Sequence, residues 1–133
     1  MLDLVKELGI DDNTIVLFNA DNGAETLHVN WMRRDHDHDA SGGWRGMKRD
    51  AWEGGHRVPF IARWPGKIPP KQVTSQMTNT TDIFATLASV VGFALPDGAA
   101  TDSFDMLPVM LGEQDGSQPV RPHLLTLSFR GEF

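Results

Sequence analysis

The hydrophobic positions divide the chain into a few short elements. Residues 1–9 (MLDLVKELG) carry apolar side chains on one helical face, and Gly9 is placed to end that helix. Residues 14–18 (TIVLF) form an unbroken apolar run with β-branched residues at its start, a pattern typical of a strand buried on both faces of a parallel sheet. Residues 58–64 and 123–129 predict two further strands.

A second helix is predicted to begin at Asp82, with Thr80 or Thr81 as its cap and Gly92 as its end. We expect its buried stripe to consist of Ile83, Leu87, Val90 and Val91. Residues 106–111 predict a short helical turn. Residues 21–57 show no sustained period and predict a long loop, a kind of segment that is often functional. These elements indicate an α/β protein whose remaining strands lie outside the chain.

Charge and composition exclude some classes of function. Twelve basic and eighteen acidic residues give a net charge of -6, which argues against a nucleic-acid partner because phosphate binding needs a basic face. The chain has no cysteine, which excludes disulfides and thiolate metal sites. Its apolar runs are too short for a membrane span. The first residues do not resemble a signal peptide, so any export signal is expected upstream.

The first candidate site is Asp21-Asn22-Gly23, directly after the predicted strand at residues 14–18. Ligands of open α/β sheets bind outside the carboxyl ends of the strands. Asp21 and Asn22 offer oxygen ligands that suit Ca²⁺ or Mg²⁺, and Gly23 allows a sharp turn. The same tripeptide is also an ordinary turn sequence. Two adjacent residues cannot complete a Ca²⁺ shell, so further ligands would have to lie elsewhere.

A second candidate is the glycine-rich, basic stretch of residues 42–57. Arg45, Lys48 and Arg57 could bind a sulfate or phosphate ester, and the glycines would allow close approach of the backbone to that ligand. The alternative is a flexible, solvated loop. Trp44 either lines a substrate pocket or covers the core beneath the loop.

Residues 35–39 (DHDHD) form a third candidate. In an extended strand His36 and His38 would point the same way and could bind a transition metal. The alternative is a solvent-exposed loop tip without a metal.

Several of these segments, taken in order, resemble the sulfatase family. The matching segments are residues 8–18 (LGIDDNTIVLF), 21–23 (DNG), 46–48 (GMK), 52–55 (WEGG), 57–60 (RVPF), 64–66 (WPG), 81–83 (TDI) and 102–104 (DSF). The resemblance covers nearly the whole chain. No single segment decides it, but the ordered series is specific. Two differences are Asn19-Ala20, where the family usually has Thr-Ser, and the run at residues 35–39, which has no counterpart.

The resemblance implies an alkaline-phosphatase-like α/β/α sandwich with a mainly parallel sheet, of which residues 1–133 would be the latter, incomplete part of the catalytic domain. It implies a sulfuric ester hydrolase that uses a formylglycine, made from Cys or Ser in a Cys/Ser-x-Pro-x-Arg motif, and a divalent ion, usually Ca²⁺. Asp21 and Asn22 would be metal ligands, and Lys48 would contact the sulfate.

The nucleophile and the remaining acidic ligands are expected upstream, so the isolated chain is expected to be inactive and marginally folded. Family members are commonly periplasmic or secreted. The identity of the sulfate ester and the oligomeric state stay open. Two alternatives remain: a phosphate or phosphonate ester hydrolase of the same fold, and a non-catalytic metal-binding module built on residues 35–39.

Overall fold

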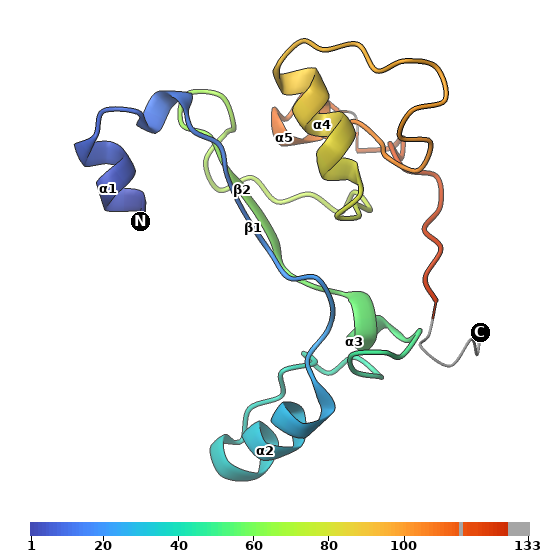
Figure 1. The fold of residues 1–133 in the computed structure, drawn as a ribbon. Helices are drawn as coiled ribbons and strands as arrows, with labels where there is room; N and C mark the ends of the chain where they lie inside the picture. The colour runs from blue at the N-terminus through green and yellow to red at the C-terminus, as the bar shows by residue number, and fades with distance from the viewer. Residues whose placement is uncertain (115, 128–133) are drawn as a thin grey trace. The chain divides into compact units, whose positions relative to one another are not determined.

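The computed structural model describes residues 1–114 and 116–127. In chain order their elements are α1 (Leu2–Glu7), a 3₁₀ turn η1 (Asp11–Asn13), β1 (Val16–Asn19), α2 (Thr26–His36), α3 (Glu53–His56), β2 (Phe60–Arg63), α4 (Asp82–Val90) and α5 (Leu107–Met110) (Figure 1). The residues form two compact units, Met1–Leu17 with Ala62–Leu124, and Phe18–Ile61 with residues 125–127. None of the described helices has the length and apolar character needed to cross a membrane.

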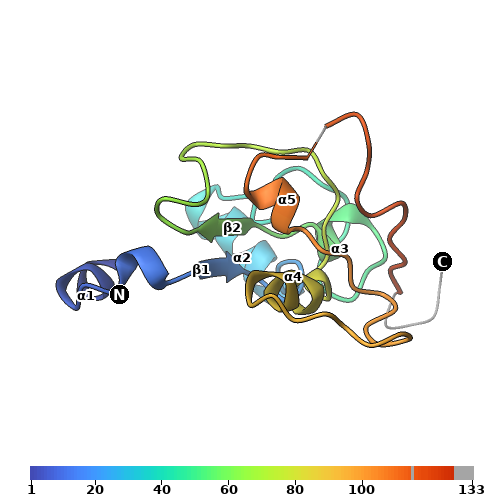
Figure 2. The same cartoon turned by 90° about the horizontal axis from the view of Figure 1, so that it is seen from above.

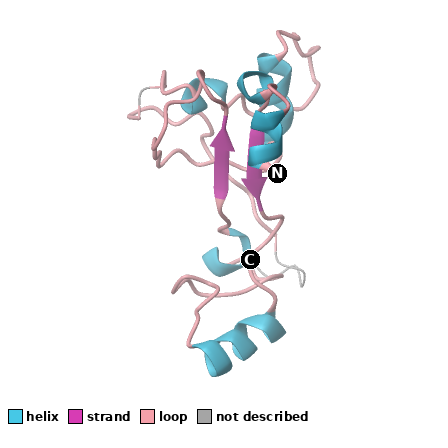
Figure 3. Cartoon of the chain, turned by 90° about the vertical axis from the view of Figure 1, so that its left-hand side faces the viewer, coloured by secondary structure: helices cyan, strands magenta, loops and turns pink. Residues whose placement is uncertain are grey.

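The two strands pair in a two-stranded sheet, and their arrows point in opposite directions in Figure 3. The Arg63 guanidinium at the end of β2 donates to both Asp11 carboxylate oxygens, at 2.8 and 2.9 Å. Trp64 Nε1 donates to the Asp12 carbonyl oxygen at 3.1 Å. These contacts tie the end of β2 to the turn that precedes β1, and so help to fix which residues of the two strands face each other.

The predicted strands agree with the sheet in part. Residues 14–18 overlap β1 and residues 58–64 contain β2, which confirms both predictions with shifted or shorter bounds. The expectation that the first strand is buried on both faces is wrong for the described residues, because Phe18 is 59% exposed. Residues 123–127 form no strand, and residues 128–129 of the third predicted strand lie outside the described residues.

The first unit has its apolar core where α4 meets α5. The two helices lie side by side in both views (Figures 1 and 2), and Ala85, Met106 and Val109 are buried between them and the adjoining loops. The predicted short turn at residues 106–111 is confirmed as α5. Gly92 follows α4 with φ +67°, as expected for a glycine that ends a helix.

The predicted buried stripe of α4 is wrong. The helix buries Asp82, Ala85 and Thr86, whereas Leu87 is 42% exposed and Val91 75% exposed. Ile83 and Val90 are only partly covered. The described residues pack against the polar side of α4 and leave most of its apolar side in contact with solvent.

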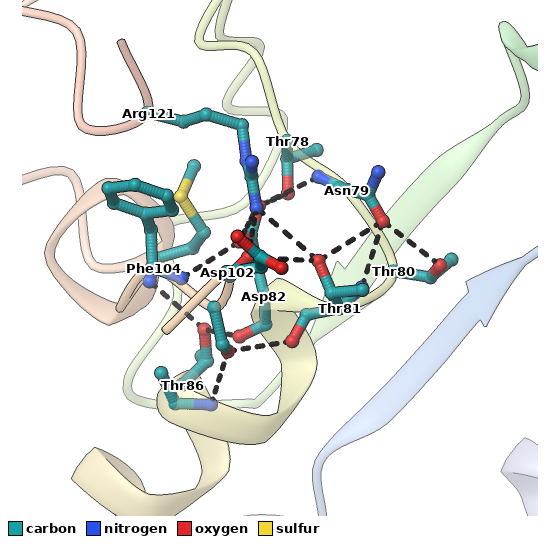
Figure 4. A network of polar contacts seen from close by, with 12 residues as sticks. Thr78, Asn79, Thr80, Thr81, Asp82, Thr86, Asp102, Phe104 and Arg121 are labelled. Atoms are coloured by element: carbon teal, nitrogen blue, oxygen red, sulfur yellow. Dashed lines mark hydrogen bonds and ion pairs between the residues drawn. The ribbon is translucent and has the colours of Figure 1, made fainter. Parts of the chain in front are cut away.

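A buried ion pair explains why the polar side of α4 faces inward (Figure 4). Arg121 donates through Nε and Nη2 to the two Asp82 carboxylate oxygens, at 3.0 and 2.6 Å. The same carboxylate accepts the backbone N–H groups of Asn79 and Phe104, both at 2.8 Å. Burial raises the pKa of Asp82, but the hydrogen bonds from Arg121 and the two backbone groups outweigh it, so the pKa is lowered overall.

The predicted threonine cap of α4 is confirmed in position, as Thr81, but not in its hydrogen bond. Thr81 occupies the N-cap position, but its hydroxyl makes no capping bond. Asn79 acts instead, because its Oδ1 accepts the Thr81 N–H at 3.0 Å. The Thr81 hydroxyl is directed to Asn79 and to the Asp102 carbonyl oxygen.

The second unit contains two helices that the sequence pattern did not predict. Residues 21–57 were expected to form a long loop, but α2 and α3 lie within this stretch. Helix α2 buries only Val29, and its Leu27 is 78% exposed. With so small a buried face, its apolar residues show no clear helical period.

Candidate active site

The candidate site begins at the turn that follows β1. Asp21, Asn22 and Gly23 form a bend directly after Asn19-Ala20. The Gly23 N–H donates to the Gly55 carbonyl oxygen at 2.8 Å. A Cβ atom on Gly23 would overlap the Gly54 carbonyl oxygen, so no other residue fits there without moving the backbone. This contact holds the turn against α3.

The glycines of the basic stretch pack against one another. The Gly54 N–H donates to the Arg45 carbonyl oxygen at 2.7 Å, and a Cβ on Gly54 would overlap the Gly46 carbonyl oxygen. A Cβ on Gly55 would overlap the Asp50 carbonyl oxygen. We call Gly23, Gly46, Gly54 and Gly55 the glycine knot. In these glycines the close approach is between segments of the chain, so the flexible loop was the wrong expectation for them, whereas a contact between their backbone and a ligand stays a prediction.

Lys48 is held next to the exit of the Asp21–Gly23 turn. Its backbone N–H donates to the Ala24 carbonyl oxygen at 2.9 Å. The side chain is partly buried, and its ammonium forms no ion pair or hydrogen bond with the described residues. A single backbone hydrogen bond therefore brings the predicted sulfate-binding lysine into the neighbourhood of the two predicted metal ligands.

Glu25 and Arg49 flank this backbone contact. Arg49 Nη1 donates to both Glu25 carboxylate oxygens, at 2.8 and 2.9 Å. The hydrogen bond from Arg49 lowers the pKa of Glu25 most, and the positive charges of Arg49 and Lys48 and a bond from the Thr26 N–H lower it further. No sequence pattern pointed to this pair.

The three residues predicted to bind substrate are exposed, and each takes part in a stacked pair. The Arg45 guanidinium lies 3.8 Å from the centre of the Trp52 ring, and that of Arg57 lies 4.3 Å from the centre of the Trp44 ring. Arg57 Nε also donates to Glu53 at 2.7 Å. Arg45 makes no hydrogen bond from its side chain within the described residues, so its N–H groups remain available to an anion.

The prediction for residues 35–39 is wrong in its geometry. His36 belongs to the last turn of α2, and Asp37 has the left-handed backbone conformation, with φ +48°. Asp39 accepts hydrogen bonds from Ser41, Arg33 and Gly43, and the first two are the main reasons why its pKa is lowered. The described residues contain no group of three or more His, Asp or Glu side chains placed to hold a metal. The run ends a helix and does not form the extended strand that the prediction assumed.

Comparison with known proteins identifies the family. The family model described as Sulfatase matches residues 1–93. The chain belongs to the sulfatase family. It is 39% identical over 121 residues to the steryl-sulfatase of Rattus norvegicus, a match that covers 89% of this chain and 20% of that protein. It is 37% identical over 120 residues to the N-acetylgalactosamine-6-sulfatase of Canis lupus familiaris, covering 90% and 22%.

A comparison with solved structures agrees with the assignment to the sulfatase family. A protein from a Bacteroides thetaiotaomicron locus for the metabolism of glycosaminoglycans matches with a TM-score of 0.80 at 32% identity, over 98% of this chain and 27% of that one. The predicted α/β class and the resemblance to sulfatases are confirmed. This sulfatase chain spans about a fifth of the length of the curated relatives named above.

The Asp21–Gly23 turn fits part of the metal site that a sulfatase requires. The Asp21 carboxylate is exposed, the Asn22 amide is partly exposed, and neither side chain hydrogen-bonds to a described residue. Both therefore present free oxygen atoms on a turn fixed by Gly23, which is the chemistry of a hard divalent cation. Two side chains are too few for a Ca²⁺ shell, so an ion bound at this turn would need further oxygen ligands.

The sulfatase chain contains one Ser-x-Pro-x-Arg string, at residues 117–121, which the expectation of a wholly upstream motif overlooked. The arginine of this string is buried in an ion pair, because the Arg121 side chain is 6% exposed and bonded to Asp82. The string also follows the Asp21–Gly23 turn in the chain, whereas the resemblance predicts the nucleophile before that turn. We assign residues 117–121 a structural use in the first unit.

Proposed function

We propose that the complete protein to which this chain belongs hydrolyses sulfate esters, and that the chain contributes Asp21, Asn22 and Lys48 to its active site. Family membership supports the reaction class. The observation that carries the assignment of residues is the hydrogen bond from the Lys48 N–H to the Ala24 carbonyl oxygen, at 2.9 Å. It brings a lysine that forms no ion pair with the described residues next to two oxygen-bearing side chains, Asp21 and Asn22, that hydrogen-bond to none of those residues.

In this proposal the chain's residues bind and orient the ester. Asp21 and Asn22 donate oxygen ligands to a divalent cation, which we propose to be Ca²⁺, with Mg²⁺ as the alternative. When bound, the cation and the formylglycine of the complete enzyme supply charge neutralisation and the nucleophile. Lys48 donates a hydrogen bond to an anionic sulfate oxygen and stabilises the charge that grows on the ester oxygen as the bond breaks.

Arg45, Arg57 and Trp44 are proposed as residues that contact the rest of the substrate. Stacking on Trp52 and Trp44 fixes the planes of the two guanidinium groups, and this lowers the entropy that each would lose on binding an anion. We also propose that the complete protein acts in the periplasm or outside the cell, in keeping with the family resemblance.

The test uses the complete protein, produced with its formylglycine installed. We expect hydrolysis of at least one ester among 4-nitrophenyl sulfate, a steroid sulfate and 6-sulfated N-acetylgalactosamine, at a higher kcat/KM than for 4-nitrophenyl phosphate. Lys48→Ala should lower kcat about a hundredfold or more. Lys67→Ala, at an exposed turn position, is the matched control. A preference for the phosphate ester would transfer the assignment to the phosphate and phosphonate hydrolases of the same fold, and hydrolysis of none would refute it.

The metal assignment has its own measurement. Calorimetric titration of metal-free protein should give tighter binding of Ca²⁺ than of Mg²⁺, and Asp21→Asn should weaken the Ca²⁺ affinity. Equal affinity for Ca²⁺ in the wild type and in Asp21→Asn would remove Asp21 from the ligand set.

A further inference from the structure

Glu25 and Arg49 form an ion pair beside the candidate active site, and no pattern in the sequence predicted it. One nitrogen atom, Arg49 Nη1, donates to both carboxylate oxygens, at 2.8 and 2.9 Å. Glu25 is also the N-cap residue of α2 and accepts the Thr26 N–H at 3.0 Å. The carboxylate is therefore fixed at the start of a helix, and Arg49 is fixed by the carboxylate.

The backbone at Arg49 has an uncommon conformation. Its φ angle is +83°, in the left-handed region that residues with a Cβ atom rarely adopt. The preceding residue, Lys48, makes the hydrogen bond to Ala24. Residues 24 and 25 are thus linked to residues 48 and 49 by two neighbouring contacts, one through the backbone and one through side chains. Such a conformation persists only where the surroundings hold it, and these two links do so.

The charges of two cations, Arg49 and Lys48, act on Glu25, which is hydrogen-bonded to Arg49 alone of the two. The charge of Lys48 contributes to the lowered pKa of Glu25, so the carboxylate also attracts the ammonium. Both carboxylate oxygens are nevertheless occupied by Arg49. Lys48 forms no ion pair within the described residues, although a carboxylate of opposite charge lies near it.

We propose that Arg49 is a positioning residue that occupies Glu25 and so keeps the Lys48 ammonium available to an anionic substrate. This inference rests on the proposed function, because it deepens the role given to Lys48. Without Arg49, Glu25 would take Lys48 as its partner, and the lysine would be drawn toward α2 and away from the Asp21–Asn22 turn. The positive φ at Arg49 is the conformation that lets consecutive side chains serve two different partners.

The first experiment measures the availability of Lys48 directly. The rate of acetylation of Lys48 by acetic anhydride is followed by peptide mass spectrometry in the complete protein. Arg49→Gly tolerates the positive φ, so it removes the guanidinium without adding backbone strain. We expect acetylation of Lys48 to slow between about two- and fivefold in this variant, the range for an ion pair open to solvent. The double variant Glu25→Gln/Arg49→Gly should restore the wild-type rate.

Two further variants make the result specific. Arg49→Lys keeps a cation next to Glu25 and should keep acetylation of Lys48 near the wild-type rate. Arg34→Ala removes an exposed arginine whose one ion pair within the described residues is with its neighbour Asp35, and it should change nothing at Lys48. An unchanged rate in Arg49→Gly would overturn the proposal, and so would a rate that stays slow in the double variant, because a structural role alone would not be relieved by Glu25→Gln.

Activity gives a second, separable readout. In a protein that hydrolyses a sulfate ester, kcat/KM should fall severalfold in Arg49→Gly and recover in the double variant. If the wild-type protein hydrolyses no sulfate ester, the proposed function fails, while the acetylation rates still decide whether Arg49 keeps Glu25 from Lys48. If the wild type is active and the acetylation rates do not follow this pattern, the positioning role fails alone.

Discussion

The Arg121–Asp82 pair gives the sharpest test of the structure. Arg121→Met removes the guanidinium and leaves a carboxylate whose side chain is 1% exposed. Removal of one partner from a buried ion pair costs about 3–5 kcal/mol, because the remaining charge stays desolvated. Two backbone N–H groups still donate to Asp82, which offsets part of that loss. We therefore expect a loss of unfolding free energy near the lower end of the range, about 3 kcal/mol.

The double variant Asp82→Asn/Arg121→Met separates the charge from the packing. The introduced asparagine would carry no charge, so the desolvation penalty disappears, but its NH₂ group would face one of the two backbone donors. An unsatisfied buried donor costs about 1–3 kcal/mol. The double variant should therefore be more stable than Arg121→Met, and the two substitutions should be coupled by about 1–3 kcal/mol.

The assay has to report on this region, because a large protein does not unfold in one step. Native-state hydrogen exchange of the complete protein, read on peptides that cover residues 79–106, measures the local opening free energy. A loss below about 1 kcal/mol in Arg121→Met, or additive effects of the two substitutions, would show that the pair is neither buried nor coupled as described.

Four further predictions concern separate features. Gly54→Ala should destabilise the second unit by about 1–3 kcal/mol, because the added Cβ would overlap backbone atoms. Gly116→Ala should be neutral, because no heavy atom lies within 4 Å of the place that its Cβ would take. Equal rates of hydrogen exchange in the two variants would contradict the glycine knot. The pKa of Asp82 is lowered on folding, so the stability that its carboxylate contributes is complete above the unfolded pKa of about 3.9 and is lost as pH falls through the lower folded pKa. Acid unfolding curves should therefore show a smaller loss of stability below about pH 4 in Asp82→Asn than in the wild type. Identical curves would exclude this contribution of Asp82. Ser117 should remain an unmodified serine, so the peptide that contains it should show no loss of two hydrogens by mass spectrometry; a formylglycine at that position would overturn its structural assignment. The isolated 133-residue chain should show no cooperative thermal transition, because few apolar side chains of its described residues are buried, and a sharp monomeric transition in calorimetry would refute this.

Local patterns predicted local structure where a few neighbouring residues decide it. Gly9 and Gly92 adopt the positive φ angles expected of glycines that end helices. The hydrophobic runs located both strands to within a few residues. Helix α2 was missed because it buries a single valine, so burial left no periodic signal in its sequence.

Contacts between distant residues could not be read from the sequence. Asp82 looked like a favourable first-turn residue of α4, but its partner Arg121 lies far along the chain, and that pairing turns the polar side of the helix inward. Asp21, Asn22 and Lys48 were proposed from residue type and from their places after the first predicted strand and in the basic stretch, and the family resemblance added their specific roles. Glu25 and Arg49 were missed, because neither spacing nor residue type distinguishes this ion pair from ordinary surface charges.

The hydrogen bond between the Lys48 N–H and the Ala24 carbonyl oxygen closes a loop that contains all of α2. Because its two ends are tied together, residues 26–43 form a cassette whose length and sequence can change while Lys48 and the glycine knot stay in place. The entropy of closing such a loop grows only slowly with its length. A sulfatase with this arrangement can acquire new side chains in the cassette without moving Lys48, which also makes residues 35–39 a suitable point for the insertion of foreign segments.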